Sequence, residues 1–183
     1  MSELHADALS LLEGWGAPTA RQEALRLEYL AHLRTHADGL ARSCHPDHIT
    51  ASTLVLDVAH QRVLLTLHAK AGQWFQLGGH TEPEDMTLPG AALREATEES
   101  GIDGLRLDPI PVHLDAHSVP FCGGRPGTRH LDVRFLAVAP PAAEAAISEE
   151  STDLRWWPVV ALPSGERSLG ELVELGRHRA RHF

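Results

Sequence analysis

Three glutamates, Glu95, Glu98 and Glu99, fall on one side of a predicted helix within residues 78–102. At 3.6 residues per turn they share an arc of roughly 120° with a set of apolar positions, namely Leu88, Ala91, Ala92 and Ile102. This arc begins and ends apolar, so we expect it to face the protein. Acids on an inward face lose solvation and repel one another, at a cost of several kcal/mol. Mg²⁺ offsets that cost because it prefers carboxylate and phosphate oxygens. The segment therefore predicts a metal site for phosphate chemistry.

The alternative is a solvated helix surface carrying an Arg94–Glu98 pair at i, i+4. It would require Leu88, Ala92 and Ile102 to face water while Leu93 and Thr97 turned inward. The inward acidic face is the better interpretation.

The same segment resembles the signature of the Nudix hydrolases. The matching residues are Gly79, Asp85, Arg94, Glu95, Glu98, Glu99, Gly101 and Ile102. Two features depart from the family pattern. Asp85 stands where the family usually has Glu, one residue further from Arg94 than is usual, and Leu77 replaces a frequent proline. Both changes lie upstream of the acid cluster, whose spacing is kept.

The resemblance implies an α/β fold, a Nudix-like α/β/α sandwich with a mixed sheet. It also implies hydrolysis of a phosphoanhydride bond in a nucleoside diphosphate linked to another moiety, with Mg²⁺ or Mn²⁺ as cofactor. Glu98 and Glu99 correspond to the family's principal metal ligands, and the carbonyl of Gly78 to a further ligand. Glu95 either binds a second ion or acts as general base, and Arg94 orients a carboxylate through a bidentate pair.

The family often draws one more acid from a loop, and Glu149 and Glu150 are the candidates here. Either is equally well explained as a surface acid. The other members of the fold leave two alternatives: a non-hydrolytic nucleotide-sensing module and an isoprenoid diphosphate isomerase. The intact acid cluster favours the hydrolase. Nucleoside triphosphates, dinucleoside polyphosphates and nucleotide sugars all remain candidate substrates.

Substrate contacts are predicted from an alternating segment in which His130, Asp132 and Arg134 share one face of a strand. That face either borders water, as is common in antiparallel sheets, or floors the substrate cleft with Arg134 or His130 meeting phosphate. Lys70 and His80, which flank the glycine pair, complete the candidate basic groups. Each of these is individually also explained as a surface residue.

Length and composition predict one domain over residues 1–183: a helical N-terminal extension (1–44), a Nudix core (48–163) and a C-terminal helix (164–183). A net charge of −9 argues against nucleic acid or an anionic membrane as the main partner. Two cysteines make no disulfide framework, and the N-terminus has no signal-peptide pattern, so we expect a cytoplasmic protein acting on a small nucleotide.

Apolar patterning places the remaining elements. Helices are expected at 2–13 and 19–37, the latter capped by Thr19, where they pack on the domain or form a homodimer. A hairpin is expected at 50–58 and 63–68, with strands at 105–117, 129–139 and 153–157 and a helix at 168–179. The cluster Cys44–His48 invites a zinc interpretation, but one isolated cluster lacks four ligands with paired spacing. A loop leading into a strand is preferred.

Overall fold

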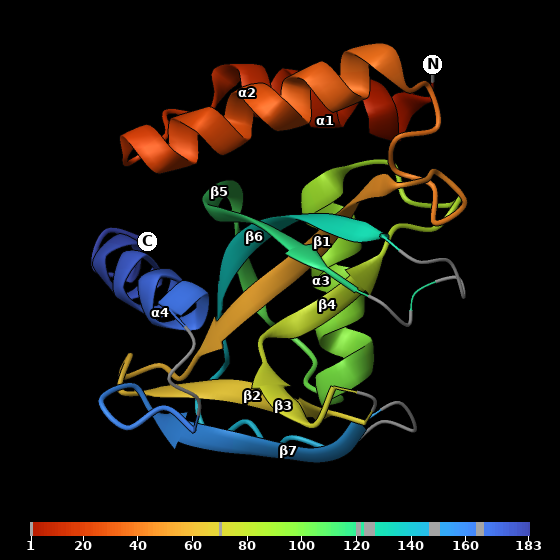
Figure 1. Cartoon of the computed structure of the whole chain (residues 1–183). Coiled ribbons are helices and arrows are strands. Elements are labelled where there is room, and N and C mark those ends of the chain that lie inside the picture. The colour runs from red at the N-terminus through yellow and green to blue at the C-terminus, as the bar shows by residue number, and fades with distance from the viewer. Residues whose placement is uncertain (1, 70, 120–121, 123–126, 147–150, 164–166) are drawn as a thin grey trace.

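The computed structural model describes residues 2–69, 71–119, 122, 127–146, 151–163 and 167–183. Two helices open the chain, a sheet follows with one helix inserted between its strands, and a further helix closes it (Figure 1). The elements are α1 (Glu3–Gly14), α2 (Ala20–Thr35), β1 (Asp47–Leu56), β2 (Arg62–His68), β3 (Gln73–Phe75), β4 (Leu77–His80), α3 (Leu88–Ser100), β5 (Arg106–Ser118), β6 (Arg129–Val138), β7 (Ser151–Pro158) and α4 (Arg167–Ala180).

The sheet is mixed, as expected. Its seven strands run in the order β3-β2-β1-β6-β5, with β4 added beside β1 and β7 beside β2. β1 and β6 are parallel over their whole length, and the other pairs are antiparallel. The predicted hairpin is confirmed, but β1 starts at Asp47 and pairs with β2 only near its end. Its earlier part, from Thr50 to Thr53, pairs instead with β4.

Two helical layers cover opposite faces of the β1–β6 pair (Figure 1). Successive side chains of a strand point to opposite faces. Thr53 of β1 donates a hydrogen bond to the Ala92 carbonyl of α3 (3.0 Å), whereas Leu54 packs on Gly176 of α4. α1 and α2 join the α3 layer, where Leu12, Tyr29 and Leu33 are fully buried against the sheet. The chain therefore forms the expected α/β/α sandwich with an N-terminal helical extension.

Local signals set the bounds of the helices. Thr19 caps α2 by accepting from the Gln22 amide, as predicted, and Thr87 caps α3 by accepting from the Gly90 amide. α3 ends at Gly101, whose φ of 64° is a left-handed conformation open to glycine.

The predicted inward face of α3 is partly wrong. Its buried positions include Ala96 and Ser100, whereas the Glu98 side chain is 60% exposed. The apolar residues of α3 that pack against the sheet, and not the glutamates, lie at the middle of its buried face. This arrangement leaves Glu98 at the rim.

Across the described residues, no helix is long and apolar enough to cross a membrane.

Candidate active site

The glycine pair brings the backbone of β4 into close contact with β1 and α3. Gly78 has a φ of 145°, and a Cβ there would lie 2.4 Å from the Cα of Ser52. A Cβ on Gly79 would lie 2.6 Å from Oε2 of Glu95. The Gly78 amide donates to Oε2 of Glu99 at 2.8 Å. A side chain at position 78 would therefore meet the β1 backbone, whereas one at position 79 would meet only the movable end of Glu95. The Gly78 amide lies directly beside the α3 glutamates.

Arg94 sits at the centre of the acid cluster. Its Nη1 donates to Glu95 at 3.0 Å and to Glu98 at 3.1 Å, so two of the three predicted ligands converge on one guanidinium. Its Nη2 also donates to the carbonyl of His80 at 3.1 Å, which ties α3 to the end of β4. The hydrogen bond to Asp85 and the neighbouring Glu95 raise the pKa of Arg94 further above its ordinary value. The predicted orienting role therefore has the necessary contacts.

Asp85, the residue that departs from the family pattern, forms a bidentate pair with Arg94. Its oxygens accept from Nε at 3.1 Å and from Nη2 at 2.9 Å. Oδ2 also accepts from the Glu82 amide at 2.7 Å. Burial acts to raise the pKa of Asp85, but these hydrogen bonds outweigh it and lower the pKa below its ordinary value. The extra residue in the loop is thus accommodated while the aspartate still reaches Arg94.

The three glutamates differ in exposure. The Glu95 side chain is 17% exposed, Glu99 is partly buried against β4, and Glu98 faces solvent. These carboxylates, with the Gly78 backbone drawn close to them, form a set of oxygen donors open on one side. Oxygen donors suit Mg²⁺ and Mn²⁺, which keep open positions for substrate phosphate. The residues present therefore fit the metal that the resemblance implies.

The polar face of β6 is confirmed as a common face, but it is buried rather than solvated. Asp132 and Arg134 are 3% and 4% exposed, so the solvent-facing alternative is wrong for these two residues. Asp132 accepts from the hydroxyls of Thr50 and Ser52 (3.1 and 2.7 Å). Burial acts to raise the pKa of Asp132, but the charge of Arg134 together with His117 and the hydrogen bonds from Arg134 and Ser52 lowers it below its ordinary value.

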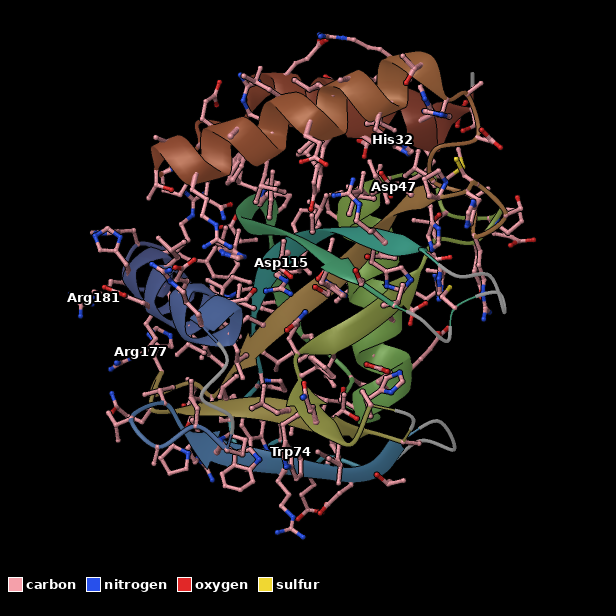
Figure 2. All side chains as sticks on the ribbon, in the orientation of Figure 1. His32, Asp47, Trp74, Asp115, Arg177 and Arg181 are labelled. Carbon is pink, nitrogen blue, oxygen red and sulfur yellow. The ribbon has the colours of Figure 1, made fainter. Side chains whose placement is uncertain are left out.

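Each nitrogen of the Arg134 guanidinium donates to the protein. The acceptors are Asp132 (2.8 Å), Ser168 (2.6 Å) and Asp115 (3.1 Å). Figure 2 shows Asp115 inside the molecule, between the sheet and the start of α4. In this arrangement Arg134 joins β5 and β6 through ion pairs and α4 through a hydrogen bond to the Ser168 hydroxyl. A direct contact of Arg134 with substrate phosphate stays a prediction.

The remaining predicted substrate residues fall in two groups. His80 and His130 lie close together, with ring centroids 4.9 Å apart. Burial and neighbouring positive groups lower the pKa of His80 to about 4 and that of His130 to about 3, so both rings are neutral near pH 7. Lys70, Glu149 and Glu150 lie outside the described residues.

Two further residues join these histidines: His48, predicted only as part of the Cys44–His48 cluster, and Cys122, for which no role was predicted. His48 Nε2 lies 3.1 Å from His80 Nε2, and Cys122 Sγ lies 3.5 Å from the same atom. Of the Cys44–His48 segment, His48 alone enters this group. The other three members come from segments that are distant along the chain, so no local spacing could have predicted the group.

Comparisons with known proteins agree with this geometry. The family model described as the NUDIX domain matches residues 46–175. No curated protein sequence matches the chain significantly. Solved structures do match. An Ap4A hydrolase from C. elegans superposes with a TM-score of 0.62 at 18% identity, over 74% of this chain and 98% of that one. A NUDIX family hydrolase from Clostridium perfringens gives 0.56 at 24% identity, over 74% and 97%.

A third structure, the E. coli dihydroneopterin triphosphate pyrophosphohydrolase, gives a TM-score of 0.54 at 20% identity, over 74% of this chain and 93% of that one. At these identities the structures establish the fold, while the family match covers most of the chain and includes the whole acid cluster. With the glycine pair, Arg94 and the α3 glutamates in place, the chain belongs to the NUDIX domain family.

Proposed function

We propose that this protein is a divalent-metal-dependent hydrolase of a phosphoanhydride bond in a nucleoside diphosphate derivative. The observation that carries the proposal is the convergence of Glu95 and Glu98 on Arg94, beside Glu99 and the closely packed Gly78. An anionic substrate would not approach such a cluster in a protein of net charge −9 unless a cation were bound there.

Glu98, Glu99 and the carbonyl of Gly78 would hold the metal, with Glu95 either completing the set or remaining free for proton transfer. A divalent ion bound there would neutralise charge on phosphate oxygens and make a nearby water more acidic. Arg94 holds the carboxylates of Glu95 and Glu98 in place. In its second role Glu95 would take a proton from the attacking water as general base.

The partner that follows from this chemistry is a small nucleotide-type molecule. Nucleoside triphosphates, dinucleoside polyphosphates and nucleotide sugars are all candidate substrates, because the acid cluster would recognise the phosphates they share. A cytoplasmic location suits such a substrate. Dimerisation through α1 and α2 stays a prediction that the mass of the protein in solution can test.

The test is product release from a panel of nucleoside di- and triphosphate derivatives, with Mg²⁺, with Mn²⁺ and with chelator. The key variant is Glu98→Gln, which removes a charge from a side chain that is 60% exposed, so folding should persist. A loss of about 3 kcal/mol of metal-dependent stabilisation would lower kcat by about 100-fold. The matched control is Glu84→Gln, an exposed acid in the loop before α3, which should keep full activity.

Two results would count against the proposal. Near-normal turnover by Glu98→Gln would remove Glu98 from the metal site. Nucleotide binding without turnover of any panel member, in the folded wild-type protein with either metal, would favour the nucleotide-sensing module.

A further inference from the structure

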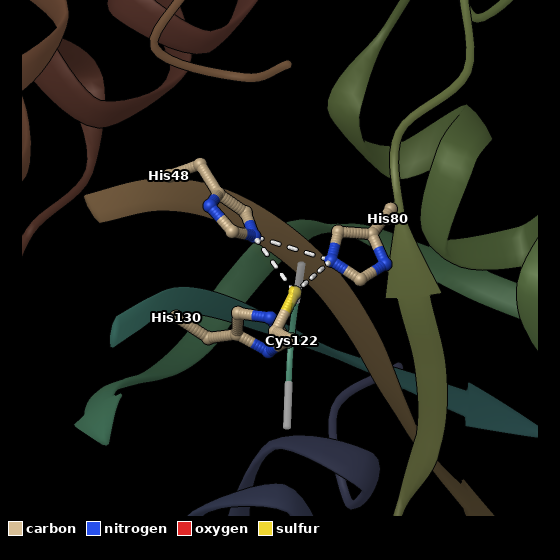
Figure 3. A group of neighbouring side chains, drawn as sticks. All are labelled: His48, His80, Cys122 and His130. Atoms are coloured by element: carbon tan, nitrogen blue, oxygen red, sulfur yellow. Dashed lines mark hydrogen bonds between the residues drawn. The ribbon is translucent and has the colours of Figure 1, made fainter. Parts of the chain in front are cut away.

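A second group of metal-binding side chains lies beside β4, with ligand atoms unlike those of the acid cluster. It consists of His48, His80, Cys122 and His130, each of which offers one ligand atom, and all four atoms lie within 4.8 Å of one another. Figure 3 shows the three rings and the thiol directed toward a common centre. They come from β1, β4, the segment that connects β5 to β6, and β6 itself.

The distances suit a single tetrahedral ion. Zinc bonds of about 2.0–2.1 Å to nitrogen and 2.3 Å to sulfur would separate two nitrogens by about 3.4 Å and a nitrogen from a sulfur by about 3.6 Å. The His48 and His80 Nε2 atoms lie 3.1 Å apart, and Cys122 Sγ lies 3.9 Å from His48 Nε2 and 3.5 Å from His80 Nε2. The His130 ring completes the group, with its centroid 4.8 Å from that of His48. The separations among His48, His80 and Cys122 are within about 0.4 Å of these values, and the ligand atom of His130, within 4.8 Å of the others, would move closer on binding the ion.

The histidines are also prepared as ligands. Nδ1 of His48 lies 3.2 Å from the carbonyl of Cys44, so this nitrogen carries the proton and the lone pair of Nε2 points into the group. A backbone carbonyl orients metal-binding histidines in the same way in many sites. His48 and Cys122 are 0% and 6% exposed. Burial favours the neutral imidazole, which is the form that binds a metal.

Hydrogen bonds within the group do not satisfy all of its polar atoms. His80 can donate to His48, and the thiol of Cys122 can interact with either ring. His130 Nε2 is nevertheless buried without a hydrogen-bond partner among the described residues. A buried polar atom left without a partner destabilises the folded protein, because it loses its hydrogen bonds to water. A bound ion would remove this destabilisation by engaging all four side chains.

We propose that His48, His80, Cys122 and His130 form a tetrahedral Zn²⁺ site distinct from the acid cluster. Nitrogen and sulfur ligands select zinc, whereas the oxygen ligands of the glutamates select Mg²⁺ or Mn²⁺. Four protein ligands leave no open position, so the role is structural. The site links Cys122 to β1, β4 and β6. Cys122 binds as the thiolate and releases its proton to solvent.

The zinc site assigns His80 and His130 a role other than the predicted phosphate contact. It also bears on the acid cluster, because His80 directly follows Gly79 and its carbonyl accepts from Arg94. Fixing the ring of His80 would hold the end of β4, and with it the glycine pair, beside the α3 glutamates. The proposal does not depend on the hydrolase activity.

The experiment measures metal content and the cobalt spectrum of the full-length protein. Purified wild-type protein should hold about one zinc ion per chain. Replacement by Co²⁺ should give the visible bands of tetrahedral cobalt together with a thiolate-to-cobalt charge-transfer band. The Cys122→Ser variant should lose that charge-transfer band. Cys44→Ser is the matched control, because Cys44 is also buried but its thiol lies outside the group, so it should keep zinc and spectrum.

A further variant, Glu98→Gln, separates this proposal from the proposed function: it should retain zinc whatever its activity. The proposal is overturned if folded wild-type protein incubated with Zn²⁺ retains none, or if Cys122→Ser keeps the charge-transfer band. If Cys122→Ser does not fold, the wild-type spectrum decides, because folded protein without a thiolate band contradicts the assignment. Cobalt held only by the glutamates would give no such band.

Discussion

Replacing Arg94 with lysine keeps the positive charge but removes the fork that binds Asp85. The guanidinium makes two hydrogen bonds to Asp85 and also reaches Glu95 and the His80 carbonyl, and a single ammonium cannot span these positions. Hydrogen bonds to charged groups contribute about 1.5–3 kcal/mol each. Because the Arg94 side chain is 21% exposed, hydrogen bonds to water would compensate for part of the lost free energy. We therefore expect a net destabilisation of about 2 kcal/mol, or a Tm lower by about 4–8 °C for a chain of this size.

The functional effect should exceed the stability effect, because Arg94 positions the glutamates. Residues that orient metal ligands typically contribute about 10- to 100-fold to activity or metal affinity. We expect Arg94→Lys to lower kcat/KM in that range, to require more Mg²⁺ for half-maximal rate, and to recover partly at high Mg²⁺. A purely structural role would lower Tm without moving the Mg²⁺ requirement.

The assay is initial rate against Mg²⁺ concentration at a temperature where both proteins are folded, with thermal unfolding measured in parallel. Arg62→Lys is the matched control, because Arg62 pairs with Asp57 at a hairpin far along the sheet from α3 and is 56% exposed. It should change stability by less than about 0.5 kcal/mol. A wild-type rate and Mg²⁺ dependence for Arg94→Lys would refute the positioning role.

Three further predictions concern the packed interior around this site. Gly78→Ala should destabilise by about 3 kcal/mol or more, measured by urea unfolding, because its Cβ would meet the Ser52 backbone at 2.4 Å. Arg134→Met should cost about 3–5 kcal/mol by leaving Asp132 buried and unpaired, and adding Asp132→Asn should recover part of that loss. The free energy of unfolding should fall as pH drops below about 5, because the pKa of Asp132 is lower in the folded protein than in the unfolded chain.

The predicted dependence of the free energy of unfolding on pH has a definite direction. A carboxyl whose pKa falls on folding stabilises the protein above its unfolded pKa of about 4, and that contribution is lost as pH falls through the folded value. Arg134→Met should flatten this dependence, since the charge that lowers the pKa of Asp132 is gone. A dependence equal to that of wild type would contradict the assignment. For Gly78→Ala, unchanged stability would show that β4 shifts freely against β1.

Much of the fold could be predicted from the sequence, because its signals act between neighbours in the chain. Thr19 caps α2 because its hydroxyl needs only the amide of Gln22, three positions on. The alternation of His130, Asp132 and Arg134 predicted a shared face because strand geometry repeats every two residues. Arg94 was predicted to orient a neighbouring carboxylate, and it donates to Glu95 and, one helical turn on, to Glu98.

Tertiary structure decided what those local patterns could not. Burial of Ala96 and Ser100 leaves Glu98 on the outer side of α3. The buried Arg134 is satisfied by the Asp115 carboxylate of β5 and the Ser168 hydroxyl of α4. The His48 group depends on the parallel pairing of β1 with β6, which sets His48 opposite His130, 82 positions away along the chain. Periodicity along a chain is set by backbone geometry, but the meeting of distant segments depends on strand order and register, which only the packed core determines.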